Sequence, residues 1–297
     1  MANARFGRVL TAMVTPFHDD GSFDVDGAVA LARWLVDHGN DGLVLAGTTG
    51  EAPTLSDDEK VELWTAVRAA VDVPLVAGTG TYDTRHTCEL SERAAATGVD
   101  GLLVVTPYYN RPSQAGLEAH FKAVAAATDL PMVIYDIPGR TGRKVDTSLL
   151  IQLADEVPTI VGVKDAAGNP GETARVIAGA PDDFGVWSGD DAMTLPLLAV
   201  GAVGIIGTGT HWFGEVMAEL IAAFGKGDHD RAQELNASLF DSFAYESREI
   251  AQFALAVKVA LRVLGQPAGP CRLPIGPEPE GLEDEARRVL EDLGLLG

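Results

Sequence analysis

Positive charge is scarce in this sequence. Its 297 residues hold 22 Lys and Arg against 43 Asp and Glu, which gives a formal net charge of −21 at pH 7. A nucleic-acid-binding protein normally presents a basic face, and an anionic membrane surface attracts basic segments, so the composition excludes both classes of partner. A small anionic substrate stays open, because it needs only one local cationic group.

Cysteine and metal-ligand patterns are equally sparse. The two cysteines, Cys88 and Cys271, are too few for a disulfide framework and too far apart in the chain for a paired zinc motif. The histidines show no paired ligand spacing, so we expect no metal, two reduced structural thiols and a cytoplasmic location. The six histidines are His18, His38, His86, His120, His211 and His229.

Long apolar runs are absent as well. No run reaches the roughly 18 uninterrupted apolar residues of a membrane span, and the short apolar part of the N-terminal segment is typical of a strand rather than a signal peptide. Hydrophobic residues nevertheless make up 46% of the chain. That share supports a large buried core and excludes a disordered protein.

Eight short runs rich in Val, Ile and Leu recur along the chain. They are continuously apolar, which is typical of strands buried on both faces, and the segments between them have helical spacing. Ser56 and Glu59 form a capping box, and Asp190 is placed to cap a helix over Ala192–Val200. The runs are Val9–Thr15, Gly42–Ala46, Pro74–Ala77, Gly101–Val105, Met132–Tyr135, Ile160–Lys164, Gly185–Ser188 and Val203–Ile206.

This alternation predicts an α/β fold. Eight strand–helix units without a long break favour a closed (β/α)8 TIM barrel over residues 1–225. A doubly wound open sheet is the alternative, and it is disfavoured because no GxGxxG follows the first strand. We expect residues 226–297 to form a C-terminal helical region packed on the barrel. Its predicted parts are helices over Asp228–Tyr245 and Arg248–Leu264, a loop over Gly265–Pro279 and a charged helix from Gly281 onward.

In such barrels the active site lies at the carboxyl ends of the strands. Lys164 is the only one of six lysines that ends an apolar strand. A buried ammonium is costly unless it is paired or its pKa is lowered. The residue is therefore either a nucleophile that forms an imine with a carbonyl compound or a lysine salt-bridged to Asp165 or another carboxylate.

The preceding strand ends beside it in Tyr135 and leads into a Gly/Pro turn with Arg140. A phenol at this position serves proton transfer, or the tyrosine is an amphipathic residue of the barrel rim. A guanidinium held in a stiff turn suits bidentate binding of a carboxylate, although a solvated surface arginine fits the same pattern.

Three other strand ends carry polar turns. Gly47–Glu51 reads GTTGE and offers hydroxyl and backbone donors for a carboxylate or oxyanion, or ordinary turn chemistry. Thr106–Pro112 exposes two adjacent tyrosines between prolines, suited to an interface or to a proton path. Gly207–Thr210 allows close approach of a small ligand to the backbone or binding of a phosphate, although no basic residue lies near it in the sequence.

Together, GTTGE at 47–51, TPYYNRP at 106–112, YDIPGRTG at 135–142, VGVKDAAG at 161–168 and SGDD at 188–191 occur in order at strand ends. This set resembles the 4-hydroxy-tetrahydrodipicolinate synthases (dihydrodipicolinate synthases), a family in the pyruvate-lyase group that includes N-acetylneuraminate lyase. The resemblance covers essentially the whole chain, with RLPIGP at 272–277 included. Two features resemble the synthases more closely than the other members of the pyruvate-lyase group. They are the arginine of IPGRTG and the TPYYNRP segment.

The resemblance implies a role for each of these residues. It implies that Lys164 forms the imine with pyruvate, that Tyr135 donates and accepts protons, and that Thr48 links Tyr135 to Tyr109 in a proton relay. It further implies three substrate contacts. These are Thr49 on the pyruvate carboxylate, the backbone carbonyl of Ile206, and Arg140 on the carboxylate of L-aspartate 4-semialdehyde.

The same resemblance implies an enzyme of lysine and diaminopimelate biosynthesis. Such a lyase needs no cofactor or metal and is a homotetramer of two dimers, in which Tyr109 reaches in from a neighbouring subunit. The competing hypotheses are another pyruvate-dependent aldolase or lyase that acts on a sugar acid, a phosphate-binding barrel enzyme that uses the Gly207 turn, and a non-catalytic pyruvate-binding protein.

Overall fold

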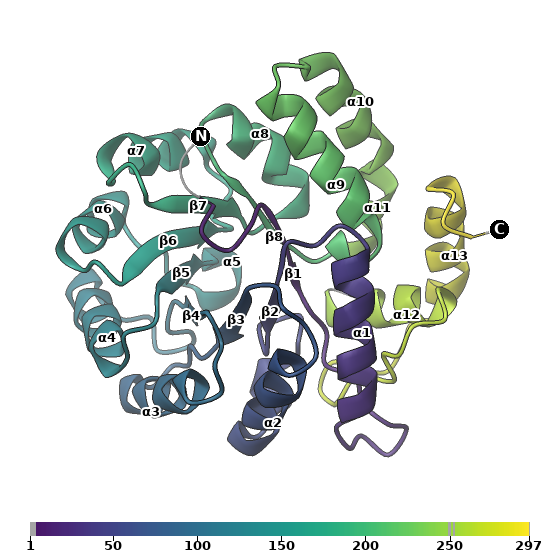
Figure 1. The fold of residues 1–297 in the computed structure, drawn as a ribbon, viewed down its shortest axis with the longest axis horizontal. Helices are drawn as coiled ribbons and strands as arrows, with labels where there is room; N and C mark the ends of the chain where they lie inside the picture. The colour runs from purple at the N-terminus through teal and green to yellow at the C-terminus, as the bar shows by residue number, and fades with distance from the viewer. Residues whose placement is uncertain (1–3, 249–250, 252, 297) are drawn as a thin grey trace. The chain divides into compact units, whose positions relative to one another are not determined.

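Eight parallel strands, in chain order, form one closed barrel in this structure, a computed structural model that describes residues 4–248, 251 and 253–296. All eight predicted strands are confirmed, with ends that differ by at most a few residues, and so is the (β/α)8 TIM barrel fold (Figure 1). The strands are β1 (Val9–Ala12), β2 (Gly42–Leu45), β3 (Leu75–Gly78), β4 (Gly101–Val105), β5 (Met132–Asp136), β6 (Ile160–Asp165), β7 (Gly185–Ser188) and β8 (Gly204–Gly207).

The chain divides into two compact units. The first comprises Met1–Arg8 and Pro74–Ile206, and the second comprises Val9–Val73 and Gly207–Gly297. The boundaries of these units differ from the predicted boundary between residues 225 and 226. The predicted division into a barrel and a C-terminal helical region stays a prediction.

The first unit carries β3 to β7 and most of β8. Its helices are α3 (Thr84–Ala95), α4 (Gln114–Ala127), α5 (Pro138–Thr141), α6 (Thr147–Glu156), α7 (Pro170–Gly179), the 3-10 turn η2 (Asp191–Met193) and α8 (Thr194–Ala199). The side chains of β4, β5 and β7 are almost wholly buried, as continuous apolar strands require. In β6, Gly162 is needed, because a Cβ there would lie 2.4 Å from the Gly185 carbonyl oxygen.

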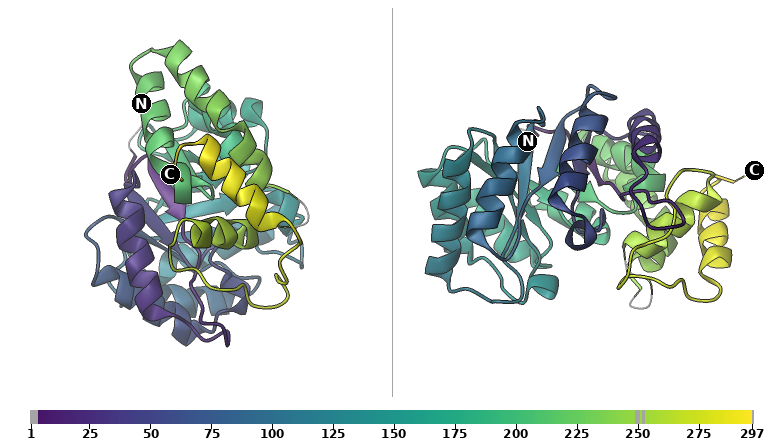
Figure 2. Two further views of the ribbon diagram at one scale, coloured as in Figure 1. Left: turned by 90° about the vertical axis from the view of Figure 1, so that its right-hand side faces the viewer. Right: turned by 90° about the horizontal axis from the view of Figure 1, so that it is seen from below.

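The second unit carries β1, β2 and the C-terminal helices. Its helices are α1 (Val25–Asp37), the 3-10 turn η1 (Ala52–Thr54), α2 (Asp57–Arg68), α9 (Thr210–Gly225), α10 (His229–Ser238), α11 (Phe240–Glu246), α12 (Ala254–Val263) and α13 (Leu282–Asp292). Helix α9 packs on β1 and on α10, and α13, the yellow helix of Figure 2, packs on α12. Thr11 of β1 donates a hydrogen bond of 2.7 Å to Thr210, which fixes the start of α9 against the strand.

The predicted helix caps are largely confirmed. The Ser56 hydroxyl accepts from the Glu59 N–H at 3.2 Å, and the Glu59 carboxylate accepts from the Ser56 N–H at 2.8 Å, so the capping box starts α2. Asp190 caps as expected, accepting from the Ala192 N–H at 3.0 Å. It starts the 3-10 turn η2, however, and the α-helix that follows begins at Thr194.

The C-terminal helices differ from prediction in two places. A single helix over Asp228–Tyr245 is wrong, since α10 and α11 are separated at Leu239. The Ser238 hydroxyl donates to the Leu235 carbonyl at 2.7 Å and the Leu239 N–H to the Asn236 carbonyl, so the last turn tightens and the helix stops. The helix expected over Arg248–Leu264 is observed only as α12, which begins at Ala254 after Phe253, whose φ is 51°. Residues 249–250 and 252 lie outside the described part.

Candidate active site

Lys164 and Tyr135 occupy directly opposed positions on neighbouring strands. Strands β5 and β6 pair in parallel with Tyr135 opposite Lys164 and Asp136 opposite Asp165. Because side chains alternate along a strand, Tyr135 and Lys164 share one face of the sheet and the two aspartates share the other. The Lys164 Nζ lies 4.4 Å from the centroid of the Tyr135 ring, and both residues are about 95% buried.

The environment of Lys164 makes its ammonium easier to deprotonate. Burial lowers the pKa of its ammonium to about 8, with a smaller lowering by the positive charge of Arg140 and an opposing effect of Asp191. No hydrogen bond or ion pair engages its Nζ among the residues that the structure describes. A lysine in this state supplies a free electron pair near neutral pH, as imine formation requires.

The alternative of an ion pair between Lys164 and Asp165 is wrong. The Asp165 carboxylate accepts from the Thr173 hydroxyl at 2.6 Å and from the Ala167 N–H at 2.9 Å. It therefore anchors the loop between β6 and α7.

Gly189 makes room for the Lys164 side chain. A Cβ on Gly189 would lie 3.0 Å from the Lys164 Cγ and 3.1 Å from its Cε, distances that are too short for ordinary contact. A Cβ there would also lie 3.0 Å from the Ala166 Cβ, so a larger residue would require Lys164 or Ala166 to shift by a few tenths of an ångström. SGDD stands out in the sequence as a motif, but nothing in it marks this glycine as the residue that meets Lys164.

Asp191 is a second residue of SGDD that sequence reasoning missed. It is 96% buried, and its negative charge raises the pKa of Lys164 against the stronger effect of burial. A buried carboxylate near an amine that becomes a cationic imine stabilises the charge. The signal in the sequence was the pair of aspartates in SGDD, of which only Asp190 was given a role, as a helix cap.

Arg140 sits in a one-turn helix directly after β5. The Arg140 N–H donates to the Ile137 carbonyl at 3.0 Å, and Gly142 closes the turn with a φ of 68°. Although the residue as a whole is exposed, partial desolvation lowers the pKa of its guanidinium. Its positive charge also acts on Lys164, so the structure brings Arg140 into the surroundings of the predicted nucleophile.

Asp136 holds the far end of the same loop. Its buried carboxylate accepts from the Val145 N–H at 3.2 Å. Burial raises its pKa to about 7, with a smaller raising effect of Asp165, while Lys144 lowers it. This residue, also missed in the sequence analysis, ties the segment that carries Arg140 back to strand β5.

Tyr109 projects away from its own chain. It is 94% exposed with a φ of 73°, so its side chain makes almost no contact within the described residues. Its neighbour Tyr108 packs edge-on against Tyr82 at 5.5 Å between ring centroids, and burial raises the Tyr108 pKa. Asn110 donates to the Tyr82 carbonyl at 2.9 Å, which stiffens the loop.

In the second unit, the GTTGE segment forms a tight turn after β2. The Glu51 N–H donates to the Thr48 carbonyl at 3.1 Å and the Ala52 N–H to the Gly47 carbonyl at 3.2 Å. Thr49 is 97% buried, with its hydroxyl 3.4 Å from that of Thr208. Thr48 is half-buried. The Glu51 and Ala52 N–H groups are thus used within the turn, and binding of a carboxylate or oxyanion by this segment stays a prediction.

The turn after β8 is closed by a neutral histidine. Nδ1 of His211 donates to the Thr208 carbonyl at 2.6 Å, and Nε2 accepts from the Val14 N–H at 3.1 Å. Burial lowers the pKa of His211 to about 4, which fits this pair of bonds. Ile206, Thr208 and Thr210 are nearly inaccessible to solvent, so the turn offers little room for a phosphate group.

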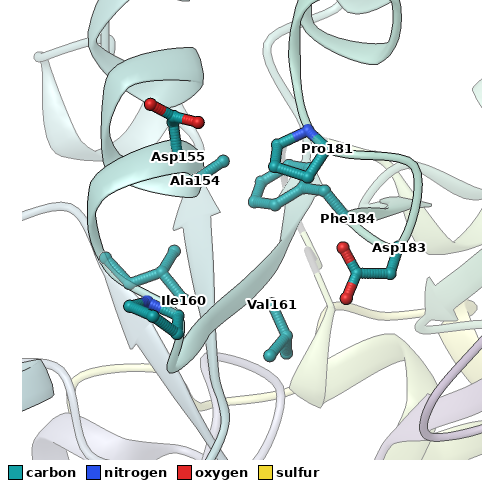
Figure 3. Close-up of a pocket in the computed structure, with 8 residues that line it drawn as sticks. Ala154, Asp155, Ile160, Val161, Pro181, Asp183 and Phe184 are labelled. Atoms are coloured by element: carbon teal, nitrogen blue, oxygen red, sulfur yellow. The ribbon is translucent and has the colours of Figure 1, made fainter.

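One cavity of about 210 Å³ lies at the opposite end of β6. Figure 3 shows Asp155, Ile160, Asp183 and Phe184 around it. Because Ile160 begins the strand and Lys164 lies near its end, this cavity is separate from the candidate site.

Within residues 4–248, 251 and 253–296, no group of three or more His, Cys, Asp or Glu side chains is arranged to hold a metal ion. Over the same residues, no helix has both the length and the apolar character needed to cross a membrane.

Known proteins match the whole length of the chain. The sequence model of the Dihydrodipicolinate synthetase family matches residues 5–293. The 4-hydroxy-tetrahydrodipicolinate synthase of Moorella thermoacetica is 49% identical over 294 residues, covering 98% of this chain and 100% of the relative. That of Acidothermus cellulolyticus is 51% identical over 296 residues, with 99% and 94% covered. A solved dihydrodipicolinate synthase from Bacillus anthracis has a TM-score of 0.93 at 40% identity, covering 98% of this chain and 99% of that one.

Proposed function

The chain belongs to the dihydrodipicolinate synthetase family, and we propose that it condenses pyruvate with L-aspartate 4-semialdehyde through an imine on Lys164. This is the 4-hydroxy-tetrahydrodipicolinate synthase reaction of lysine and diaminopimelate biosynthesis. The observation that carries the mechanism is the buried Lys164 amine opposite Tyr135, with its pKa lowered to about 8.

The first step joins Lys164 to pyruvate. The neutral amine adds to the keto carbon, and loss of water gives a cationic iminium. Tyr135 supplies the proton that converts the leaving hydroxyl to water, since its side chain lies on the same face as Lys164. The buried Asp191 stabilises the iminium charge, just as it favours the protonated amine.

The second step forms the carbon–carbon bond. The pyruvate methyl group loses a proton, the electron pair moves toward the iminium nitrogen, and the resulting enamine attacks the aldehyde carbon. The aldehyde oxygen takes up a proton and becomes a hydroxyl. The free amino group of the second substrate then attacks the iminium carbon and expels the Lys164 amine, which closes the ring and regenerates the enzyme.

We assign the proton path to Tyr135, Thr48 and Tyr109. Thr48 follows β2, and in a closed parallel barrel the carboxyl ends of the strands face one end. The almost complete exposure of Tyr109 supports its use by a second copy of the chain. We therefore propose a homotetramer, built from two dimers, in which Tyr109 crosses the dimer interface.

We assign substrate binding to Thr49, Ile206 and Arg140. The buried Thr49 hydroxyl and the Ile206 backbone carbonyl, each at a strand end, would contact pyruvate. Arg140 would bind the carboxylate of the aldehyde, since its guanidinium is held on a stiff turn beside Lys164 and forms bidentate pairs with carboxylates. These groups need neither a cofactor nor a metal.

A cytoplasmic location completes the proposal. Cys88 and Cys271 are both free thiols, as expected in a reducing compartment.

The sugar-acid lyase alternative is less well supported. The curated relatives described above carry the synthase name, and Arg140 suits a substrate with a carboxylate near its aldehyde. To test this, the purified enzyme is incubated with pyruvate and either L-aspartate 4-semialdehyde or N-acetylmannosamine, and the product is identified by mass spectrometry. We expect condensation with the first only. Turnover of the amino sugar without turnover of the semialdehyde would overturn the assignment.

A further inference from the structure

Glu51 and Lys258 form a wholly buried ion pair within the second unit. The Lys258 Nζ lies 2.6 Å from the Glu51 Oε1, and both side chains are 0% exposed. A buried ion pair is rarely the most stabilising way to fill such a space, because apolar side chains of similar volume often do as well. Its position, however, connects helix α12 to the turn that carries Thr48 and Thr49.

Glu51 is an integral part of that turn. It has a φ of 58°, which side-chain-bearing residues seldom adopt. Its N–H donates to the Thr48 carbonyl, and its own carbonyl accepts from the Thr54 N–H at 2.9 Å. The neighbouring Gly50 carbonyl accepts from the Thr15 hydroxyl at 2.7 Å. A shift of the Glu51 side chain is therefore transmitted to the backbone of Thr48.

Lys258 is held as firmly on the other side. Its Nζ donates to the Pro270 carbonyl at 2.8 Å and lies 4.1 Å from the centroid of the Phe17 ring. The second carboxylate oxygen of Glu51 accepts from the Arg272 N–H at 2.9 Å. One carboxylate oxygen thus forms the ion pair with Lys258, and the other accepts the hydrogen bond from Arg272.

The loop after α12 is itself fixed to the turn region. The Arg272 guanidinium pairs with the Glu59 carboxylate at 2.9 and 2.5 Å and donates to the Thr54 carbonyl at 2.9 Å. Gly269 approaches Phe17 so closely that a Cβ would lie 1.7 Å from the Phe17 carbonyl oxygen. The groups that hold Glu51 are therefore rigidly placed.

We propose that Glu51 and Lys258 are positioning residues, whose buried ion pair fixes the GTTGE turn so that the Thr48 and Thr49 hydroxyls stand ready for reaction. This gives the C-terminal helices a part in the chemistry. The inference rests on the roles proposed above for Thr48 and Thr49.

The test compares Lys258→Met, Glu51→Gln and the double variant with the wild-type enzyme. Thermal unfolding establishes that each variant is folded, and steady-state kinetics give kcat and the KM for pyruvate. We expect kcat to fall roughly 10- to 100-fold, because small misplacements of groups at an active site have effects of this size. The pyruvate KM should rise with it. The double variant should recover thermal stability, because it leaves no unpaired buried charge. It should not recover kcat, because the ion pair that fixes the turn is still missing.

Lys60→Met is the matched control. Lys60 is a second buried lysine of the same unit, paired with Asp57 at 3.7 Å on helix α2. This variant also loses a buried ammonium, and we expect its kcat and KM to stay within about twofold of wild type.

A double-mutant cycle with Thr48→Val separates positioning from general stability. If Lys258 acts through the turn, Lys258→Met should cost less activity in the Thr48→Val background than in the wild-type enzyme. Three results would each overturn the proposal. The losses in the cycle could be fully additive, folded Lys258→Met and Glu51→Gln could have wild-type kinetics, or all three ion-pair variants could fail to fold. If instead Thr48→Val and Thr49→Val themselves leave the kinetics unchanged, the roles of those threonines in the proposed function fail first.

Discussion

Tyr135 and Lys164 are register partners on adjacent strands, and the lysine Nζ lies 4.4 Å from the centre of the tyrosine ring. The backbone alone sets this relationship, since both residues end buried strands of the same parallel sheet. It brings a phenol and an amine to one place. Four predictions test what surrounds this pair.

Removing the Tyr135 hydroxyl should slow the reaction without disturbing the pair's packing. Tyr135→Phe keeps the ring beside Lys164, and we expect the rate to fall by about 10²–10⁴, the usual contribution of general acid–base catalysis. Steady-state kinetics of Tyr135→Phe, Thr48→Val and the double variant provide the measurement. The two losses should combine less than additively, and simple additivity would place Thr48 outside the relay.

Arg140→Ala should act on the second substrate more than on the first. A charge-assisted hydrogen bond contributes about 1.5–3 kcal/mol, so kcat/KM for the aldehyde should fall roughly 10- to 150-fold while imine formation with pyruvate is largely retained. Arg140→Lys should recover only part of this, because an ammonium lacks the planar fork. Equal damage to both substrates would assign Arg140 a structural role.

The same substitution has a consequence for pH dependence. The positive charge of Arg140 lowers the pKa of Lys164, so its removal should raise that pKa above about 8. In Arg140→Ala, the pH at which imine formation reaches half its plateau should move upward, as measured by trapping at a series of pH values. A shift downward would contradict the described electrostatics.

Gly189→Ala should block Lys164 while leaving the fold intact. The new Cβ would stand 3.0 Å from the Lys164 Cγ, which forces the lysine from its present course. We expect imine formation to be lost or strongly slowed, as seen by trapping. Gly171→Ala is the control in the same unit, because its Cβ would come no nearer than 3.4 Å to the Asn169 Oδ1; equal effects of the two variants would refute the role of Gly189.

Two buried histidines should make the protein sensitive to mild acid. Burial lowers the pKa of both His120 and His211 to about 4, from the usual value of about 6.5. The two histidines therefore bind more protons in the unfolded chain between these values, so they make the free energy of unfolding fall as the pH drops from 6.5 toward 4. Asp136, whose pKa is raised to about 7, opposes them over the same range. Each histidine contributes a slope of about 1.4 kcal/mol per pH unit in that window.

Urea unfolding at several pH values between 4 and 7 measures this slope. His211→Asn should reduce it, whereas His229→Asn, at the exposed start of α10, should leave it unchanged. A slope that does not respond to His211→Asn would show that this histidine is protonated in the folded state.

The barrel was predictable because each of its strands is buried on both faces and therefore apolar throughout. Lys164 stood out for the same reason, as the one lysine at the end of such a strand. The break between α10 and α11 was not predictable, because a local serine hydrogen bond interrupts an otherwise continuous helical pattern.

The surroundings of the site were harder to foresee. Gly189 contacts Lys164, the charge of Asp191 acts on Lys164, and Asp136 bonds to Val145. The sequence around each residue does not show which partner it will meet. The pair of Glu51 and Lys258 is the extreme case. It joins residues more than two hundred positions apart, and only the folded chain brings them together.

The most direct test of the account is covalent trapping of Lys164. The enzyme is incubated with pyruvate and borohydride, digested, and mapped by mass spectrometry, with Lys164→Ala as the control. The account predicts one pyruvate-derived adduct, on the peptide that contains Lys164, and none in the variant. An adduct on another lysine, or no adduct on the folded wild-type enzyme, would contradict it.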